Sequence, residues 1–101
     1  MPHNFDPNQN YHSFIDNKTE PLVFVHGVGL DQKMWDSQVN SLSDHSIITY
    51  DLLGHGKTPY NKEEVTLNDF SDQLDYLLKF LKIDKINLVG FSLGSLIALD
   101  F

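Results

Sequence analysis

The sequence predicts an α/β protein, a mostly parallel sheet with covering helices, and three observations support this fold class. Short apolar runs alternate with helical patterns three times between residue 22 and the end of the 101-residue chain. The apolar runs are continuous rather than alternating, as in strands that are covered on both faces of a parallel sheet. The repeated order of strand and helix is the order that parallel sheets with covering helices require.

The predicted elements follow from local patterns. After residue 67, leucines and Phe70 recur three or four residues apart, which is the spacing of one apolar helix face. Thr66 and Asp69 resemble a capping box at the start of this helix, with aspartate in place of the usual glutamate. Strands are expected over residues 22–25, 46–50 and 86–89, and helices over residues 32–42, 67–81 and from residue 93 onward.

The first 20 residues are polar and precede the predicted domain. Residues 1–10 contain two prolines and three asparagines, and we expect a mobile tail or a poor first strand there. Residues 11–15 are expected to form an edge strand, and a turn follows before the domain proper at residues 21–101.

Composition and charge exclude several functional classes. Seven lysines, no arginine and fourteen acidic residues give a formal charge of −7, which argues against nucleic acid or anionic lipid as a partner. The chain has no cysteine, and no histidine pair has metal-ligand spacing, so we expect no disulfide, metal or other cofactor. No secretory signal is present, and no apolar run approaches the roughly 20 residues that span a membrane, so we expect a cytoplasmic protein.

The stretch that carries chemistry lies near the end of the chain. Residues 90–94 have the sequence Gly-Phe-Ser-Leu-Gly, which fits G-x-S-x-G, between an apolar run and a helical apolar run. In such a strand–turn–helix context this pattern marks a nucleophile. A serine at the tip of so sharp a turn has a strained backbone, so small residues must stand two positions to either side. Gly90 and Gly94 meet that need, and we expect Ser92 to present its Oγ to a cleft.

Three strand-end loops together resemble the α/β-hydrolase superfamily. Residues 26–29 have the sequence His-Gly-Val-Gly, residues 51–56 have Asp-Leu-Leu-Gly-His-Gly, and residues 90–94 complete the set in the expected order. The pattern looks most like the branch of small-molecule esterases and 3-oxoadipate enol-lactonases, although similar sequences include perhydrolases, C–C bond hydrolases and a lyase. The resemblance implies the N-terminal part of an α/β-hydrolase fold, incomplete and ending just after the nucleophile turn.

The resemblance also implies catalytic roles. Ser92 would attack the substrate and form an acyl-enzyme. In this fold the oxyanion hole consists of backbone N–H groups, one from the residue after the nucleophile and one from the loop after an earlier strand. By position these donors are Leu93 and Val28.

Other residues would support the loops or line a pocket. The resemblance gives His26, Gly27 and Asp51 a structural role in holding the strand-end loops. Trp35 and Phe91 are candidates for the substrate pocket, with simple core packing as the alternative for each.

The remaining catalytic groups are missing from this sequence. In the superfamily the triad runs in the order serine, aspartate or glutamate, then histidine. Nine residues follow Ser92, none is a histidine, and the one acid, Asp100, lies two turns into the helix. We therefore expect a fragment of a serine hydrolase of small carboxylic esters or lactones, inactive by itself. The alternatives are a non-catalytic ligand-binding protein of the same fold, or a lyase or perhydrolase that uses the same serine.

Overall fold

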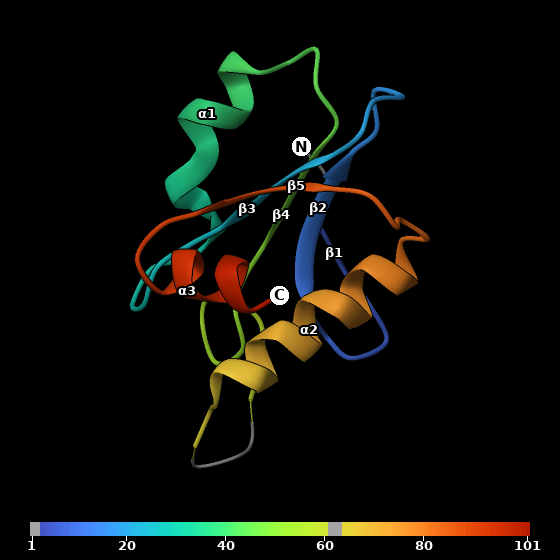
Figure 1. Ribbon diagram of the computed structural model, residues 1–101. Helices are drawn as coiled ribbons and strands as arrows, with labels where there is room; N and C mark the ends of the chain where they lie inside the picture. The colour runs from blue at the N-terminus through green and yellow to red at the C-terminus, as the bar shows by residue number, and fades with distance from the viewer. Residues whose placement is uncertain (1–2, 61–63) are drawn as a thin grey trace.

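The computed structural model describes residues 3–60 and 64–101. Among these residues, five strands form one sheet in the order β1-β2-β4-β3-β5, with helices packed against it (Figure 1). The strands are β1 (Asn4–Phe5), β2 (Tyr11–Ile15), β3 (Leu22–Val25), β4 (Ile47–Tyr50) and β5 (Asn87–Gly90). The helices are the 3-10 helix η1 (Gln32–Trp35), α1 (Asp36–Ser41), α2 (Leu67–Phe80) and α3 (Leu93–Asp100).

The sheet confirms the predicted α/β class. Strands β4, β3 and β5 are parallel neighbours, and Val23 at the centre of β3 pairs with Ile48 on one side and Leu88 on the other. Because the three strands run in the same direction, their carboxyl ends lie at one edge of the sheet. The three loops that carry the sequence motifs all leave from this edge.

The first 15 residues differ from the prediction. We expected an edge strand at residues 11–15, but β2 lies inside the sheet, because β1 pairs with its first residues and β4 pairs antiparallel with the rest. The turn between β1 and β2 is ordered by the Asp6 carboxylate, which accepts hydrogen bonds from the backbone N–H groups of Asn8 and Asn10, both at 2.9 Å. Polar side chains therefore order a segment that its composition alone suggested to be mobile.

Helix α2 matches its predicted bounds to within one residue and has the predicted capping box. The Thr66 hydroxyl accepts a hydrogen bond from the Asp69 N–H at 3.1 Å, and the Asp69 carboxylate accepts one from the Thr66 N–H at 2.9 Å. The helix predicted over residues 32–42 is instead a 3-10 turn followed by a short α-helix. Asp31 caps this turn through the Lys33 N–H at 2.8 Å.

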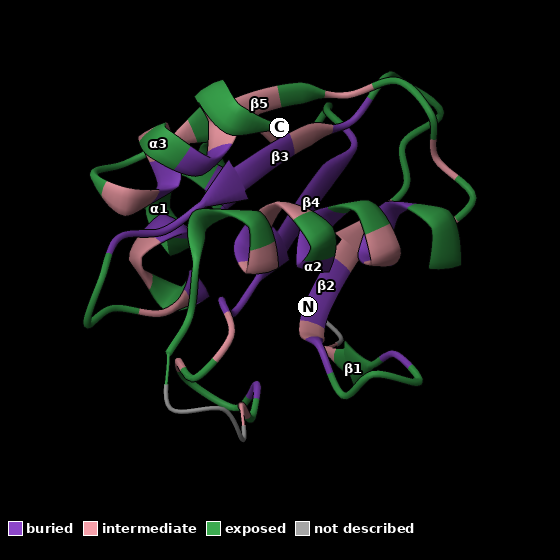
Figure 2. Ribbon diagram, turned by 60° about the horizontal axis from the view of Figure 1, so that its bottom comes forward, coloured by how far each residue is buried: buried purple, intermediate pink, exposed green. Residues whose placement is uncertain are grey.

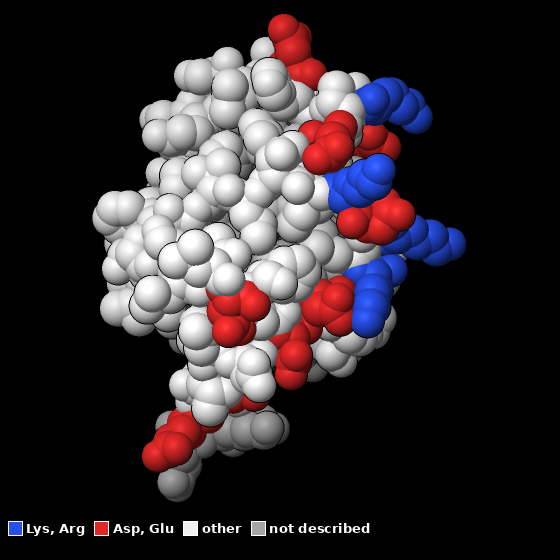
Figure 3. Space-filling model, viewed as in Figure 1, with Lys and Arg blue, Asp and Glu red and all other residues white. Residues whose placement is uncertain are grey.

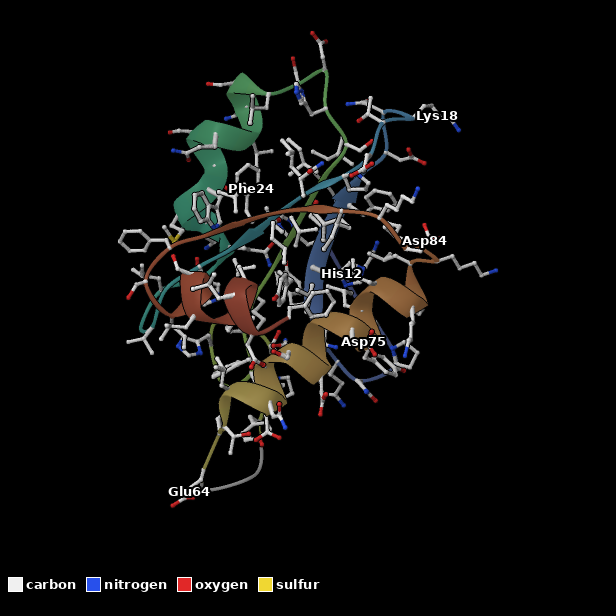
Figure 4. The ribbon with its side chains drawn as sticks, viewed as in Figure 1. His12, Lys18, Phe24, Glu64, Asp75 and Asp84 are labelled. Carbon is white, nitrogen blue, oxygen red and sulfur yellow. The ribbon has the colours of Figure 1, made fainter. Side chains whose placement is uncertain are left out.

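Two apolar clusters bury the two faces of the sheet (Figure 2). Successive residues of a strand point to opposite faces, so Val23 and Val25 join one cluster while Phe24 joins the other. Figure 4 shows Phe24 pointing toward α1, whereas Lys18, Glu64 and Asp84 extend from loops at the periphery. The larger cluster contains Val23, Val25, Ile48, Tyr50, Leu52, Phe70, Leu74, Leu77, Leu78 and Ile97, and the smaller one contains Phe24, Trp35, Val39 and Ile47.

Apolar side chains are exposed along β5 and α3. Strand β5 pairs with β3 on one side and is the last strand of the described sheet. On α3, Leu96 is 55% exposed and Leu99 is 85% exposed. Figure 3 shows few charged atoms in the left and central part of the view, where α3 lies, whereas acidic and basic side chains alternate along the right-hand edge. Within the described residues, no helix has the length and apolar character needed to cross a bilayer.

We expect the isolated 101-residue chain to be marginally stable, because this apolar surface finds no partner among the described residues. The expected result is a broad thermal transition in near-UV circular dichroism, together with binding of the dye ANS below that transition. Leu99→Lys should reduce dye binding without reducing helix content, because the side chain is almost fully exposed. A sharp cooperative melt with no dye binding would contradict the expectation.

Candidate active site

Ser92 forms the turn between β5 and α3, and its backbone is strained. Its φ is 57° and its ψ is −114°, a combination that costs a residue with a side chain about 1–3 kcal/mol. The Ser92 carbonyl accepts hydrogen bonds from the N–H groups of Ser95 at 2.9 Å and Leu96 at 3.3 Å, which fixes the residue to the start of the helix. The Ser92 side chain is exposed at the carboxyl edge of the sheet. This is the backbone arrangement of a turn that presents a nucleophile.

Two glycines allow the helix to start so close to the strands. A Cβ on Gly94 would collide with the Val25 carbonyl group, with its carbon at 2.7 Å. A Cβ on Gly90 would collide with the Gly94 carbonyl and lie 2.6 Å from the Ser95 nitrogen. The Ser95 hydroxyl closes the same junction by donating to the Gly90 carbonyl at 2.9 Å. The turn therefore depends on the absence of a side chain at both glycines.

The loop after β3 lies against the nucleophile turn. A Cβ built on Gly27 would be 3.3 Å from the Ser92 Cβ and 3.1 Å from the Phe91 ring, so the two loops touch at this point. No hydrogen bond among the described residues uses the N–H of Val28 or of Leu93. Leu93 is the first residue of α3, where N–H groups lack an intrahelical acceptor and the helix dipole favours negative charge. The structure thus places Leu93, and the loop that carries Val28, beside Ser92.

His26 is fully buried beneath this loop, and both of its ring nitrogens are engaged. Nε2 accepts a hydrogen bond from the Leu52 N–H at 2.9 Å, so the proton of the neutral ring is on Nδ1, which donates to the Gly27 carbonyl at 2.7 Å. Burial is the main cause that lowers the pKa of His26 below 6.5, and the nearby His55 lowers it further, while the hydrogen bond to Gly27 opposes both. A ring held in this way supports the loop and has no free nitrogen to accept a proton from Ser92.

Asp51 ties the loop after β4 to the start of η1. One carboxylate oxygen accepts from the Gln32 N–H and the other from the Lys57 N–H, each at 2.9 Å. Gly56 has a φ of 51°, and a Cβ there would collide with the Asp51 carboxylate, so the loop wraps closely around the acid. Both oxygens are bonded to backbone groups, which agrees with a role for Asp51 in supporting the loop.

The two pocket candidates lie in different environments. Phe91 is 51% exposed and adjoins Ser92, so it is placed to form a wall beside the nucleophile. Trp35 is 8% exposed, and its ring lies 4.9 Å from the Phe24 ring in the smaller apolar cluster. Of the two interpretations that the sequence left open for Trp35, the structure favours core packing.

Among the described residues, no histidine is hydrogen-bonded to the Ser92 hydroxyl. His12 and His55 each use Nδ1 in a hydrogen bond to a nearby backbone carbonyl, and His26 uses both nitrogens. The described residues also contain no group of three histidine or acidic side chains that could hold a metal ion. The described part of the site therefore contains an exposed serine and two N–H groups without an acceptor, and no histidine bonded to that serine.

Gln73, a polar residue on α2 that is only 5% exposed, was not among the residues predicted from the sequence. Its side chain bonds to Asn10, to the Asp51 carbonyl and to the Leu53 N–H. The sequence does indicate a buried position for Gln73. It stands three residues after Phe70 and four before Leu77, and so falls on the apolar face of the helix. A polar residue on that face requires a partner in the interior.

The family follows from comparisons with known proteins. The family model of the alpha/beta hydrolase fold matches residues 20–101, and the chain belongs to this family. It is 36% identical over 91 residues to (E)-2-((N-methylformamido)methylene)succinate hydrolase of Acinetobacter baylyi, a match that covers 89% of this chain and 35% of that protein. It is 37% identical over 79 residues to 3-oxoadipate enol-lactonase 1 of the same organism, covering 77% of this chain and 29% of the relative.

A solved structure gives the same result. A thermophilic esterase from Thermogutta terrifontis, determined with malate bound, superposes with a TM-score of 0.82 at 31% sequence identity, and the match covers 94% of this chain and 36% of the esterase chain. The chain thus spans about a third of the length of the curated relatives that it matches.

Gly94→Ala in the full-length protein is expected to lower the free energy of unfolding by about 1–3 kcal/mol or more, because the added methyl collides with backbone that cannot move independently. Gly54→Ala is the matched control, since a Cβ there makes only an ordinary contact, 3.7 Å from the Tyr60 Cβ, and its φ of 72° is the main penalty, about 1–2 kcal/mol. Urea denaturation measures the free energy of unfolding of both variants. The rate at which Ser92 reacts with a fluorophosphonate should fall for Gly94→Ala alone. Equal reactivity in the two variants would contradict the role of the close approach.

His26 should make stability depend on pH in a defined direction. Because its pKa is lower in the folded protein than its ordinary 6.5, the unfolded chain binds the proton first as pH falls. The free energy of unfolding is therefore expected to keep this contribution above pH 6.5 and to lose it progressively as pH falls toward the folded-state pKa. Urea denaturation across this range, compared with His26→Gln, measures the effect, and an identical pH slope in both proteins would refute it.

Proposed function

We propose that the full-length protein is a serine hydrolase that cleaves small carboxylic esters or lactones through an acyl-enzyme on Ser92. The observation that carries the proposal is the strained, exposed Ser92 held against the loop of Val28, with the Val28 and Leu93 N–H groups lacking acceptors. Strain of this kind persists only where the surrounding structure imposes it, and it is concentrated at functional sites.

The proposed reaction assigns a role to each of these groups. Ser92 Oγ attacks the carbonyl carbon while its proton passes to a base, and the carbonyl oxygen becomes an oxyanion that receives hydrogen bonds from Val28 and Leu93. Collapse of this intermediate expels the alcohol or opens the lactone ring, and water then releases the acid from the enzyme. Loss of one such donor typically lowers kcat by ~10²–10³. We propose that the base and the acid that orients it come from a region that corresponds to the unmatched two thirds of the relatives.

The substrate class rests on the relatives and on the surroundings of Ser92. The relatives described above include an enol-lactonase, a hydrolase of a succinate derivative and an esterase. The side chains next to the nucleophile are apolar, since Val28 is 67% exposed and Phe91 is 51% exposed. Such a surface suits the uncharged parts of a small ester or lactone.

Ser92→Ala in the full-length protein tests the proposal. Hydrolysis of p-nitrophenyl acetate is expected to fall by ~10³ or more, because the nucleophile is removed. Mass spectrometry after treatment with a fluorophosphonate should locate the adduct on Ser92 in the wild-type protein. Ser37→Ala, an exposed serine on α1, is the matched control and should retain full activity.

Other outcomes separate the alternatives. Turnover that survives in Ser92→Ala would overturn the proposal. Binding of an ester analogue with no turnover and no fluorophosphonate adduct would indicate a ligand-binding protein of this fold. Products other than an acid and an alcohol would indicate a lyase or perhydrolase that uses the same serine. The isolated 101-residue chain is expected to be inactive in the same assay, since none of its described histidines is hydrogen-bonded to the Ser92 hydroxyl.

A further inference from the structure

A chain of buried hydrogen bonds links helix α2 to the loop that carries Val28. Its first link is the peptide unit that joins Asp51 and Leu52. The Gln73 amide donates to the Asp51 carbonyl at 2.9 Å, and the Leu52 N–H of the same unit donates to His26 Nε2 at 2.9 Å. In a planar trans peptide the C=O and N–H point in opposite directions, so Gln73 and His26 hold this unit from opposite sides.

The second link is the peptide unit that joins Gly27 and Val28. Its carbonyl accepts hydrogen bonds from His26 Nδ1 at 2.7 Å and from the Leu30 N–H at 3.2 Å. Because the unit is planar and trans, fixing the carbonyl also fixes the direction of the Val28 N–H on the other side. The orientation of one oxyanion donor therefore depends on the His26 ring, and the ring depends on the Leu52 N–H.

The orientation of Gln73 is itself fixed. Its Oε1 accepts from the Leu53 N–H at 3.1 Å, and its Nε2 donates to Asn10 Oδ1 at 3.0 Å as well as to the Asp51 carbonyl. The Asn10 amide cannot be reversed, because its Nδ2 donates to the Asp6 carboxylate at 2.8 Å. A carboxylate only accepts hydrogen bonds when ionised, so Asp6 sets the direction of every bond that follows.

All of these side chains lie in the interior, where a broken bond would leave a polar group without a partner. Asp6 is 4% exposed, Asn10 is 2% exposed and Gln73 is 5% exposed. A group left unpaired under such burial pays its full cost of desolvation, which makes the alternative orientations unfavourable. The chain of bonds is therefore suited to hold a geometry rather than only to join two elements.

We propose that Gln73 is a positioning residue for the oxyanion hole: anchored by Asn10 and Asp6, it fixes the peptide unit that holds His26 and, through His26, the direction of the Val28 N–H. The inference rests on the proposed function of Ser92. Gln73 touches no reacting atom in this scheme. It acts on the transition state through two peptide units and one imidazole ring.

Gln73→Leu in the full-length protein tests the inference, because leucine has a similar size and makes none of the bonds. We expect kcat for p-nitrophenyl acetate to fall by about tenfold or more, within the ~10²–10³ that removal of a whole donor costs, with KM little changed. Phenylboronic acid, which forms a tetrahedral anionic adduct on the serine, should bind more weakly by a factor similar to the loss in kcat/KM. Unchanged kcat and unchanged boronic acid affinity in a folded Gln73→Leu protein would overturn the inference.

Leu78→Ala is the matched control for a purely structural effect. Leu78 lies on the same helix, is 6% exposed, and belongs to the apolar cluster rather than to the chain of bonds. Its truncation should lower Tm at least as much as Gln73→Leu does, and kcat measured well below both Tm values should stay at the wild-type level. A parallel loss of kcat in both variants would mean that loss of stability explains the result, and would overturn the inference.

Gln73→Glu is expected to change the pH dependence of kcat, which loss of stability alone would not do. This variant tests the inference even if Gln73→Leu fails to fold. Glutamate keeps an acceptor for the Leu53 N–H, but an ionised carboxylate would face the Asp51 carbonyl and Asn10 Oδ1, which are both acceptors. Protonation restores a donor, so the ratio of the variant's kcat to the wild-type kcat should rise as pH falls. A ratio that does not change with pH would overturn the inference. Absence of any Ser92-dependent turnover in the wild-type protein would overturn the proposed function instead.

Discussion

The close approach of helix α3 to the end of strand β3 is the constraint on which the rest of the site depends. Gly94 rests against the Val25 carbonyl, and no side chain can be inserted between them. Since β3 is paired on both sides, by β4 and β5, its end is a rigid support. The helix that starts there forces Ser92 into its strained conformation, and the loop of Gly27 lies directly beside it. One tight backbone contact thus determines where Ser92, the N-terminus of α3 and the loop after β3 meet.

The strand-end loops make some backbone hydrogen bonds of their own, and buried side chains provide others. Asp51 occupies backbone N–H groups from two directions, His26 links two loops, and Gln73 binds the peptide groups on both sides of Leu52. Each of these side chains lies in the interior with its polar atoms bonded, which avoids the cost of burying an unpaired group. Loops supported in this way can hold a backbone N–H in a fixed direction. A mobile loop could not do so.

The sequence predicted the parallel strands, helix α2 and the order of the three loops because those features are local. A continuous apolar run, a 3–4 residue period and a glycine pattern are all visible within about fifteen residues. The position of β2 inside the sheet was not predictable, because the run at residues 11–15 does not reveal that β1 will pair with it. The period of α2 places Gln73 on the apolar face, but its partners Asn10 and Asp51 lie 63 and 22 positions away in the sequence, so the groups that it binds were not predictable. Local patterns define elements, whereas the buried polar bonds join residues that only the fold brings together.

In the buried chain of hydrogen bonds the order of donors and acceptors is fixed. This order is compatible with only one protonation state of His26. From Asp6 onward, each link pairs a donor with an acceptor, and at His26 this requires a lone pair on Nε2 and a proton on Nδ1. A second proton would place an N–H on Nε2 opposite the Leu52 N–H, so two donors would face each other. Burial lowers the pKa of His26 and so favours the neutral ring. The same burial that makes His26 unsuitable as a catalytic base therefore preserves the one tautomer that can transmit the orientation of Gln73 to Val28.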